Sequence, residues 1–192
     1  MNFELPWIKC GVIAELTTKL EQVSPQFGKT VLQKMVFLLQ EVYHVNVGYD
    51  FGFHTFGPFA AELLGDLNFA ESMGFVTVKS VEETGGNGYV IESGDIIEGV
   101  LQSPTVSPFL SQHKEAIAAL VKGFGDKTAK ELELLTTIIY LNKEIMWDTN
   151  KLTLAEAISK IRELKPKFSD SEILNGMIEL KTKHDVNLVF AA

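Results

Sequence analysis

The chain has 192 residues, of which 46% are hydrophobic and 22% are charged, and this balance excludes wholesale disorder. Lysine and arginine total 17 against 25 acidic residues, which gives a formal net charge of −8. No apolar run is long enough to span a bilayer, and the first residues lack the cationic and long apolar segments of a secretory signal. The single cysteine, Cys10, has no partner for an internal disulfide. We therefore expect a cytoplasmic protein with no membrane partner.

Charge is divided unevenly along the chain. Residues 1–100 contain five lysines, no arginine and thirteen acidic residues, whereas residues 101–192 contain twelve residues of each sign. Arg162 is the single arginine of the sequence. Nucleic-acid binding needs cations that neutralise phosphates, and arginine is the side chain most used to recognise bases. The charge balance therefore argues against nucleic acid as a partner.

The pattern of apolar residues predicts two helices, a strand, a third helix and two further strands in the first half of the chain. In chain order these elements cover about residues 6–21, 29–43, 49–54, 58–73, 75–79 and 89–92. The second helix is apolar on most sides, so we expect it to lie at the centre of the protein. Pro58 suits the first turn of the third helix, and Gly74 suits its end. The glycine-rich stretch 84–88 is expected to join the last two strands as a hairpin loop.

This order of helices and strands is that of the winged-helix arrangement, within the helix-turn-helix class. Later in the chain, capping-box spacings predict helix starts at Thr128 with Glu131, Thr153 with Glu156, and Ser169 with Glu172. We therefore expect an α+β, mainly α fold, with a winged-helix (helix-turn-helix) core, a three-stranded wing sheet and a C-terminal helical half. The halves 1–102 and 103–192 are expected to pack as one compact unit. Residues 186–190 alternate in polarity and are expected to form a short edge strand or a docked tail.

The sequence contains no local motif for catalysis or metal binding. The four histidines are scattered without metal-ligand spacing, and no nucleophile elbow is present. Cys10 lies in a predicted amphipathic helix, where a free cysteine is usually a small buried hydrophobe. We therefore predict no catalytic residue, no metal and no cofactor, and we expect that the protein is not an enzyme. A site assembled in three dimensions from His54 or other histidines and distant carboxylates is the alternative.

The outer face of the predicted third helix bears on DNA binding, because this helix usually enters the major groove in the helix-turn-helix class. Residues 35–78 contain no lysine or arginine, and Glu62 and Asp66 fall on that face, where they would repel phosphates. Phe69 is the large apolar side chain of the same face. We expect the C-terminal helices to cover Phe69, and the alternative is that it anchors a partner.

Several stretches resemble a known family. They are residues 29–39 (KTVLQKMVFLL), 48–51 (GYDF) and 54–59 (HTFGPF), followed later by 132–138 and 165–168. In these motifs the chain resembles the uncharacterised YwgA-like proteins and, more distantly, the Panacea (SocA-like) domains associated with toxin–antitoxin systems. The resemblance implies a small prokaryotic cytoplasmic protein with a winged-helix core and no established enzyme activity. Many relatives have Tyr-Gly-Pro-Tyr where this chain has Phe56-Gly57-Pro58-Phe59, so the two tyrosine hydroxyls of that motif are absent here.

These observations lead to a first hypothesis, a non-catalytic winged-helix protein that acts through protein–protein contacts in a toxin–antitoxin, phage-defence or regulatory setting. The partner is another protein or a second copy of the chain, and nucleic acid is not expected. The predicted partner-binding residues are Lys34, His54, Phe56, Gly57, Pro58, Phe59 and Phe69. A purely structural role of the 56–59 turn in core packing is the competing interpretation. The alternative function is that of a DNA-binding transcriptional regulator.

Overall fold

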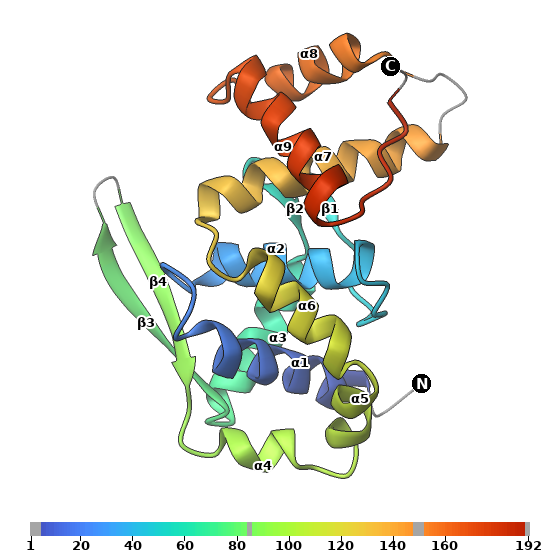
Figure 1. The fold of residues 1–192 in the computed structure, drawn as a ribbon. Helices are drawn as coiled ribbons and strands as arrows, with labels where there is room; N and C mark the ends of the chain where they lie inside the picture. The colour runs from blue at the N-terminus through green and yellow to red at the C-terminus, as the bar shows by residue number, and fades with distance from the viewer. Residues whose placement is uncertain (1–4, 84–85, 148–151, 191–192) are drawn as a thin grey trace.

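The computed structural model describes residues 5–83, 86–147 and 152–190, and Figure 1 shows its fold. The described helices are α1 (Leu5–Leu20), α2 (Lys29–Glu41), α3 (Ala61–Ser72), α4 (Ile97–Leu101), α5 (Val106–Gln112), α6 (Lys114–Phe124), α7 (Ala129–Trp147), α8 (Leu154–Leu164) and α9 (Asp170–Lys183). The described strands are β1 (Gly52–His54), β2 (Gly57–Phe59), β3 (Val76–Glu83) and β4 (Gly86–Ser93). The fold is therefore α+β and mainly helical, as the sequence predicts.

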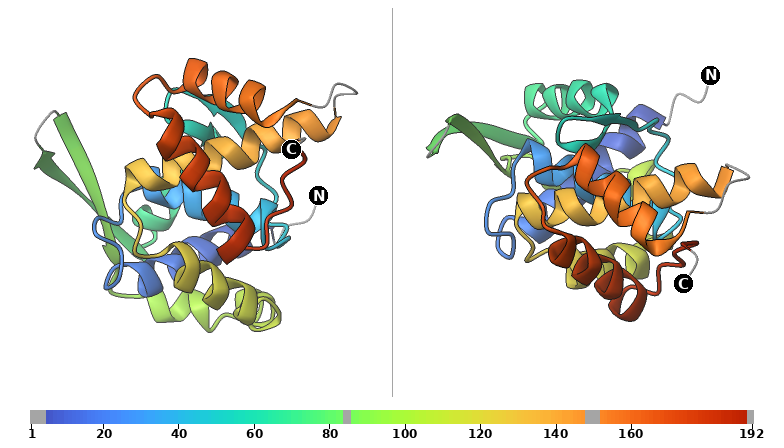
Figure 2. Two further views of the ribbon diagram at one scale, coloured as in Figure 1. Left: turned by 45° about the horizontal axis from the view of Figure 1, so that its top comes forward. Right: turned by 90° about the horizontal axis from the view of Figure 1, so that it is seen from above.

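Helix α2 lies at the centre, between α1, α3 and α4 on one side and α7, α8 and α9 on the other (Figure 1), and it packs against α6, α7, β2 and β4. Helix α1 packs against α3, α4 and α5, while α7 packs against α2 and carries α8 and α9. Helix α6 contacts both α1 and α2. The β3–β4 hairpin projects to one side of the helices, as the three views show (Figures 1 and 2). No helix of the described residues is long and apolar enough to cross a membrane.

The residues of α2 explain its central place. An unbroken run of its side chains is buried, namely Val31, Leu32, Gln33, Lys34, Met35, Val36, Phe37, Leu38 and Leu39. A helix that is apolar on all sides is stable only when it is covered on all sides, so the prediction of a central helix is confirmed. The two polar members of the run, Gln33 and Lys34, both bond to the segment around β2.

The strands of the described residues form two separate antiparallel pairs, β1 with β2 and β3 with β4. The prediction of a three-stranded wing sheet is wrong, because β1 pairs with a strand that the sequence pattern does not reveal. That strand, β2, contains Pro58, which we predict from the sequence to open the third helix. Gly57 has a φ of 89°, a left-handed conformation that favours glycine, and Pro58 is then paired with Phe53. Helix α3 therefore begins later, at Ala61.

Two glutamines of α2 hold the segment between α2 and α3 through its backbone. Gln33 donates to the carbonyl of Ala60 and accepts from its amide, at 2.8 and 2.9 Å. Gln40 makes the same two bonds with Tyr49, both at 3.0 Å. We name each such pair of bonds an amide clamp. The Gln40 clamp bonds the amide and the carbonyl of Tyr49, which a longer sheet would otherwise pair. Residues 45–51 alternate in burial but form no strand.

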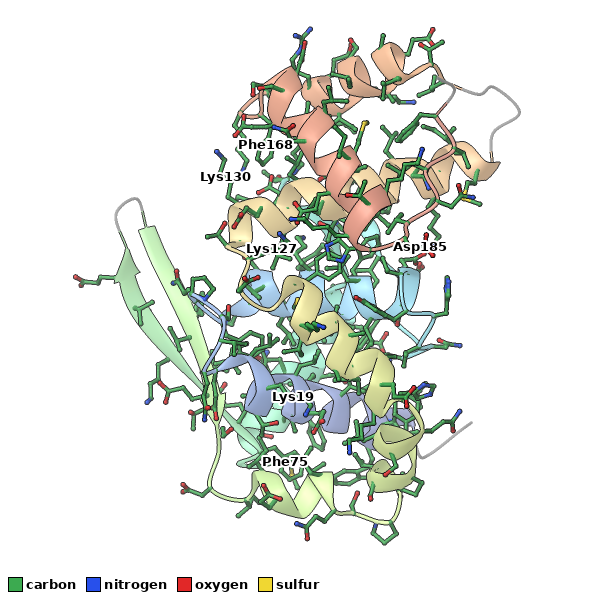
Figure 3. All side chains as sticks on the ribbon, viewed as in Figure 1. Lys19, Phe75, Lys127, Lys130, Phe168 and Asp185 are labelled. Atoms are coloured by element: carbon green, nitrogen blue, oxygen red, sulfur yellow. The ribbon has the colours of Figure 1, made fainter. Side chains whose placement is uncertain are left out.

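The capping boxes predicted for the second half are confirmed. Thr128, Thr153 and Ser169 each accept a bond from the backbone amide of the glutamate three residues later, and that glutamate bonds back to their own amide. These bonds fix where α7, α8 and α9 begin. Between α8 and α9, the buried ring of Phe168 lies 5.4 Å from the ammonium of Lys130 on α7 (Figure 3). This contact helps to seat the α8–α9 pair on α7.

The segment after α9 is a docked tail rather than an edge strand. Asn142 of α7 donates to the carbonyl of Asn187 at 3.0 Å and accepts from the amide of Val189 at 2.8 Å. Elsewhere in the second half, α5, α6 and α7 pack on α1 and α2 of the first half. That the two halves unfold together as one unit stays a prediction.

Candidate functional site

A cleft of about 340 Å³ opens between the N-terminal half of α2 and the β1–β2 hairpin. We name it the α2 cleft; its lining consists of Lys29, Thr30, Gln33, Lys34, His54, Thr55, Phe56, Gly57, Phe59 and Leu64. Five of the seven predicted partner-binding residues are in this set. Pro58 lies beside it and offers its carbonyl to Lys34, whereas Phe69 lies elsewhere. That these residues contact a partner stays a prediction.

Lys34 is the buried cation of the cleft, with only 2% of its surface exposed. Its Nζ donates to the carbonyl of Pro58 at 2.7 Å. Burial disfavours the charged amine and lowers the pKa of Lys34 to about 7, a shift that Glu133 opposes and Lys165 reinforces. At neutral pH, Lys34 is therefore balanced between its charged and neutral forms in the wall of a cleft.

Close to Lys34 lies a buried ion pair that sequence reasoning missed. Glu133 of α7 accepts from Lys165 at 2.9 Å and from Lys167 at 2.7 Å. Lys165 also donates to the carbonyl of Thr55 at the tip of the hairpin, so the hairpin, α7 and the end of α8 meet here. An acidic residue inside a buried apolar stretch of α7 is the one local signal for this pair, because such residues are rarely buried unless they are paired. The lysines are distant in sequence and leave no pattern.

The tip of the β1–β2 hairpin forms the rim of the cleft. Phe56 is 61% exposed there, and the exposed His54 has its ring centre 5.0 Å from that of Phe59. A Cβ at Gly57 would lie 3.3 Å from the Oγ1 of Thr137 on α7 and 3.6 Å from the Nζ of Lys34. Glycine at this position therefore permits both the left-handed turn and the close approach of the hairpin to α7.

A second hollow of about 390 Å³ adjoins the α2 cleft and extends to β4. It shares Lys29, Thr30 and Phe56 with the cleft. The ammonium of Lys29 lies 3.6 Å from the centre of the Tyr89 ring, in a cation–π contact with the β3–β4 hairpin. The recessed surface therefore runs from the hairpin tip, past the start of α2, to β4.

Phe69 lies on α3 and does not line the α2 cleft. Its ring packs edge-on against Trp7 of α1, with ring centres 6.1 Å apart, and 42% of the residue stays exposed. The expectation that the C-terminal helices cover Phe69 is wrong, because α3 packs mainly on α1 and β3. The structure thus separates Phe69 from the other six predicted partner-binding residues.

Glu62 and Asp66, the two acidic residues predicted on the outer face of α3, have partners within the protein. Glu62 accepts from Lys9 of α1 at 2.5 Å, and Asp66 accepts from the hydroxyl of Tyr49 at 2.9 Å. Lys9 is 3% exposed, and its Nζ lies 4.4 Å from the centre of the Tyr49 ring. Burial raises the pKa of Asp66, and the bond from Tyr49 opposes this shift. We name Lys9, Tyr49, Glu62 and Asp66 the Lys9 cluster. Within this cluster, the carboxylates compensate the buried charge of Lys9.

The α2 cleft does not assemble the catalytic set that the alternative hypothesis requires. His54 lines it, but none of its described lining residues is aspartate or glutamate. Among the residues that the structure describes, no three His, Cys, Asp or Glu side chains gather as metal ligands. Cys10 is fully buried, and burial together with Asp66 raises its pKa to about 11, so its thiol is a poor nucleophile at neutral pH. The cleft thus offers the means of binding: a buried amine, a histidine and an exposed aromatic ring.

The motifs behind the resemblance noted in the sequence meet at the α2 cleft. Gln33 clamps the backbone of Ala60, and Lys34 binds the carbonyl of Pro58, so the helix motif and the Gly-Pro motif hold each other. The chain matches no protein-family model, and no curated protein is similar to it at a significant level. The resemblance to the YwgA-like and Panacea proteins therefore stays a prediction.

Proposed function

We propose that the chain is a non-catalytic binding module that takes a segment of a partner protein in the α2 cleft. The observation that carries the proposal is the exposure of Phe56 at the rim of this cleft. A phenylalanine that is 61% exposed beside a hollow of about 340 Å³ is the arrangement of an anchor at a protein interface. Its ring offers apolar area that a bound partner removes from water.

The walls of the cleft are held by bonds within the protein. Gln33 and Lys34 bind the backbone of the hairpin segment from α2, and Lys165 binds the carbonyl of Thr55 from the end of α8. The hairpin tip is therefore fixed from two directions. A site that is already ordered loses less conformational entropy when it binds, which supports a role in recognition.

DNA binding through α3 is the alternative, and the charges favour the protein partner. Glu62 and Asp66 on α3 are bonded to α1 and to the segment before β1, yet the Glu62 side chain remains 62% exposed. A helix that carried these carboxylates into a major groove would place them near phosphates. The excess of acidic residues in 1–100 adds to this repulsion.

The biological setting of the proposal comes from the resemblance to the Panacea (SocA-like) domains. We place the protein in a toxin–antitoxin, phage-defence or regulatory system of a prokaryotic cytoplasm, with a separate protein or a second copy of the chain as its partner. The same resemblance proposes a winged-helix core in which α1, α2 and α3 are the helices and the β3–β4 hairpin is the wing. The order of these elements supports this assignment.

Site-specific photo-crosslinking in cells at native expression level tests the proposal. A photoreactive phenylalanine analogue replaces Phe56 in one strain and Met146 of α7 in the other. Both residues are 61% exposed, and Met146 lines a different hollow of about 550 Å³, so the strains differ in which hollow they probe and not in accessibility. We expect a discrete crosslinked partner from position 56 that position 146 does not give. The absence of such a product would contradict the proposal.

The captured partner is then purified, and its affinity for Phe56→Ser and Met146→Ser is measured. We expect Phe56→Ser to weaken binding by about tenfold or more, as the loss of an interface anchor does, and Met146→Ser to leave it unchanged. Both substitutions are at exposed positions, so the free energy of unfolding should stay within about 0.5 kcal/mol of the original. Equal binding by both variants would overturn the proposal.

A further inference from the structure

The five lysines of residues 1–100 fall into two groups. Lys9, Lys19 and Lys79 each lie within ion-pair distance of a glutamate. For Lys29 and Lys34, no carboxylate of the described side chains lies within that distance; Lys29 contacts an aromatic ring and Lys34 a carbonyl. Both of these lysines line the α2 cleft. In the acidic half of the chain, the two lysines without a carboxylate partner thus share one cleft.

Among the described residues, no side chain of the lining opposes the charge of these two lysines. None of the described residues that line it or the adjoining hollow is acidic, although the sequence has 25 acidic residues. Helix α2 also begins here, and its N-cap is Gly28, which has no side chain to bond the first amides. A Cβ at Gly28 would lie 2.1 Å from the carbonyl oxygen of Tyr89, so a capping side chain does not fit. The helix dipole therefore adds to the positive charge of the lysines.

Two exposed aromatic rings lie beside these lysines, at the rim of the cleft and in the adjoining hollow. Phe56 is 61% exposed and Tyr89, next to Lys29, is 39% exposed. A small inorganic anion would leave both rings in water, whereas a peptide with acidic and apolar side chains would cover them. Single-stranded nucleic acid also combines stacking with charge, but it carries a phosphate at every nucleotide, whereas the described lining of the cleft and the hollow offers two lysines, which match the one or two carboxylates of a short peptide segment. The surface therefore suits an acidic peptide best.

We infer that the partner segment in the α2 cleft is acidic, with a carboxylate held by Lys29 and Lys34 beside an apolar side chain that packs on Phe56. This inference rests on the proposed function and specifies the chemistry of the partner. A bound carboxylate favours the charged form of Lys34, so binding is accompanied by proton uptake above the lowered pKa of this amine. The affinity should therefore fall as the pH rises above about 7.

Several charged groups surround Lys34 and enter this pH dependence. Glu133 of α7 and Lys165 after α8 act on its amine, and His54 and Lys29 line the same cleft. Lys34→Met keeps these neighbours and therefore isolates the contribution of the Lys34 amine.

The test uses two peptides on the full chain. Each is acetylated and amidated and has a central phenylalanine, flanked by two glutamates on either side in one peptide and by glutamines in the other. Backbone amide NMR shifts give the location and the dissociation constant. We expect the glutamate peptide to shift the amides of residues 29–34 and 54–57 and to bind about tenfold more tightly than the glutamine peptide. Equal binding of the two peptides, or shifts elsewhere, would overturn the inference.

Variants and competing ligands sharpen the test. Lys29→Gln should weaken the glutamate peptide about fivefold, whereas Lys79→Gln, the control in the same acidic half, should leave it unchanged. From about pH 7.5 to about pH 9 the affinity of the original chain should fall, and Lys34→Met should abolish this dependence. Inorganic phosphate and a single-stranded oligothymidylate serve as the other anions. If either one binds the cleft more tightly than the glutamate peptide, the inference is wrong.

The two proposals can fail separately. If Phe56→Ser weakens the captured partner but the glutamate and glutamine peptides bind alike, the binding function stands and the acidic chemistry is wrong. If neither Phe56→Ser nor Lys29→Gln changes binding of the captured partner, the function assigned to the cleft is itself wrong.

Discussion

Two buried lysines on successive helices, Lys9 of α1 and Lys34 of α2, have different partners for their ammonium groups. They are 3% and 2% exposed. Each lies against a glycine with a positive φ, Gly48 for Lys9 and Gly57 for Lys34. Lys9 has the carboxylate of Glu62 at 2.5 Å and the ring of an adjacent tyrosine. Lys34 has a backbone carbonyl and an open cleft.

This difference separates a structural charge from a candidate functional one. Removing a charge from water is costly unless the charge is paired. In the Lys9 cluster, the Glu62 carboxylate and the Tyr49 ring stabilise the charge of Lys9 within the protein. For Lys34 a lowered pKa and the nearby Glu133 offset part of this cost, and we propose that a ligand carboxylate offsets the rest. Substitutions at these sites and at the glutamines of α2 test this contrast.

The largest loss of stability is expected from Glu133→Gln, which removes the carboxylate shared by Lys165 and Lys167. Removing one member of a buried pair costs about 3–5 kcal/mol, because the other charge stays buried. The matched change in the Lys9 cluster is Glu62→Gln, which should cost less, about 1–2 kcal/mol: the buried Lys9 loses the Glu62 carboxylate, but that side chain is 62% exposed and Asp66 still acts on Lys9. Urea unfolding measures both losses. Equal losses would remove the contrast between the two sites.

The two amide clamps of α2 give the next comparison. Gln33→Leu leaves the amide and the carbonyl of buried Ala60 without partners, at a cost of about 2–3 kcal/mol. Gln40→Leu breaks the same two bonds to Tyr49, but Gln40 is half-buried, so water replaces part of the loss and we expect about 1 kcal/mol. Thermal unfolding ranks the two variants. The reverse order would show that the hairpin is not held from Gln33.

The lowered pKa of Lys34 gives stability a pH dependence with a definite sign. The unfolded chain keeps this proton up to about pH 10.5, while the folded chain releases it at about 7. Between these values the unfolded state binds more protons, so the free energy of unfolding rises with pH, by at most about 1.4 kcal/mol per pH unit. Lys34→Met lacks this contribution. The stability of the original chain relative to Lys34→Met should therefore increase above pH 7, and a flat difference would argue against the lowered pKa.

The glycines beside the two lysines give the smallest effect. Gly48→Ala and Gly57→Ala each force a positive φ on alanine, at about 1 kcal/mol. The new methyl group at 57 lies 3.6 Å from the Nζ of Lys34, within the cleft, whereas that at 48 lies 3.8 Å from the Cε of Lys9. We expect similar melting temperatures but weaker glutamate-peptide binding only for Gly57→Ala. If both variants bind as well as the original chain, the peptide does not reach Lys34.

Elements with local signals were predictable from the sequence. The apolar run of α2 predicts a central helix, and the alternation of residues 49–54 predicts a strand, of which 52–54 form β1 and 49–51 do not. The capping boxes at Thr153 and Ser169 predict where α8 and α9 begin. In each case the residues that decide the structure lie within a few positions of one another.

Features decided by distant residues were not predictable. Pro58 suits a helix start as well as a strand edge, and the bonds of Gln33 and Lys34 to this segment decide for the strand. Five residues of the cleft were nevertheless identified from sequence, four around the Gly-Pro turn and Lys34 in the preceding helix. The ion pair of Glu133 and Lys165 was missed because its partners lie 32 residues apart in the chain.

We propose that Lys34 is a buried amine whose charged form is stabilised by a ligand carboxylate. The most direct measurement is an NMR titration of its Cε and Hε resonances in the full chain, with Lys34→Met to assign them. The account predicts a pKa of about 7 in the free protein and a higher value when the glutamate peptide is bound. A pKa near the usual 10.5 in the free protein, or a value that the bound peptide does not change, would contradict it.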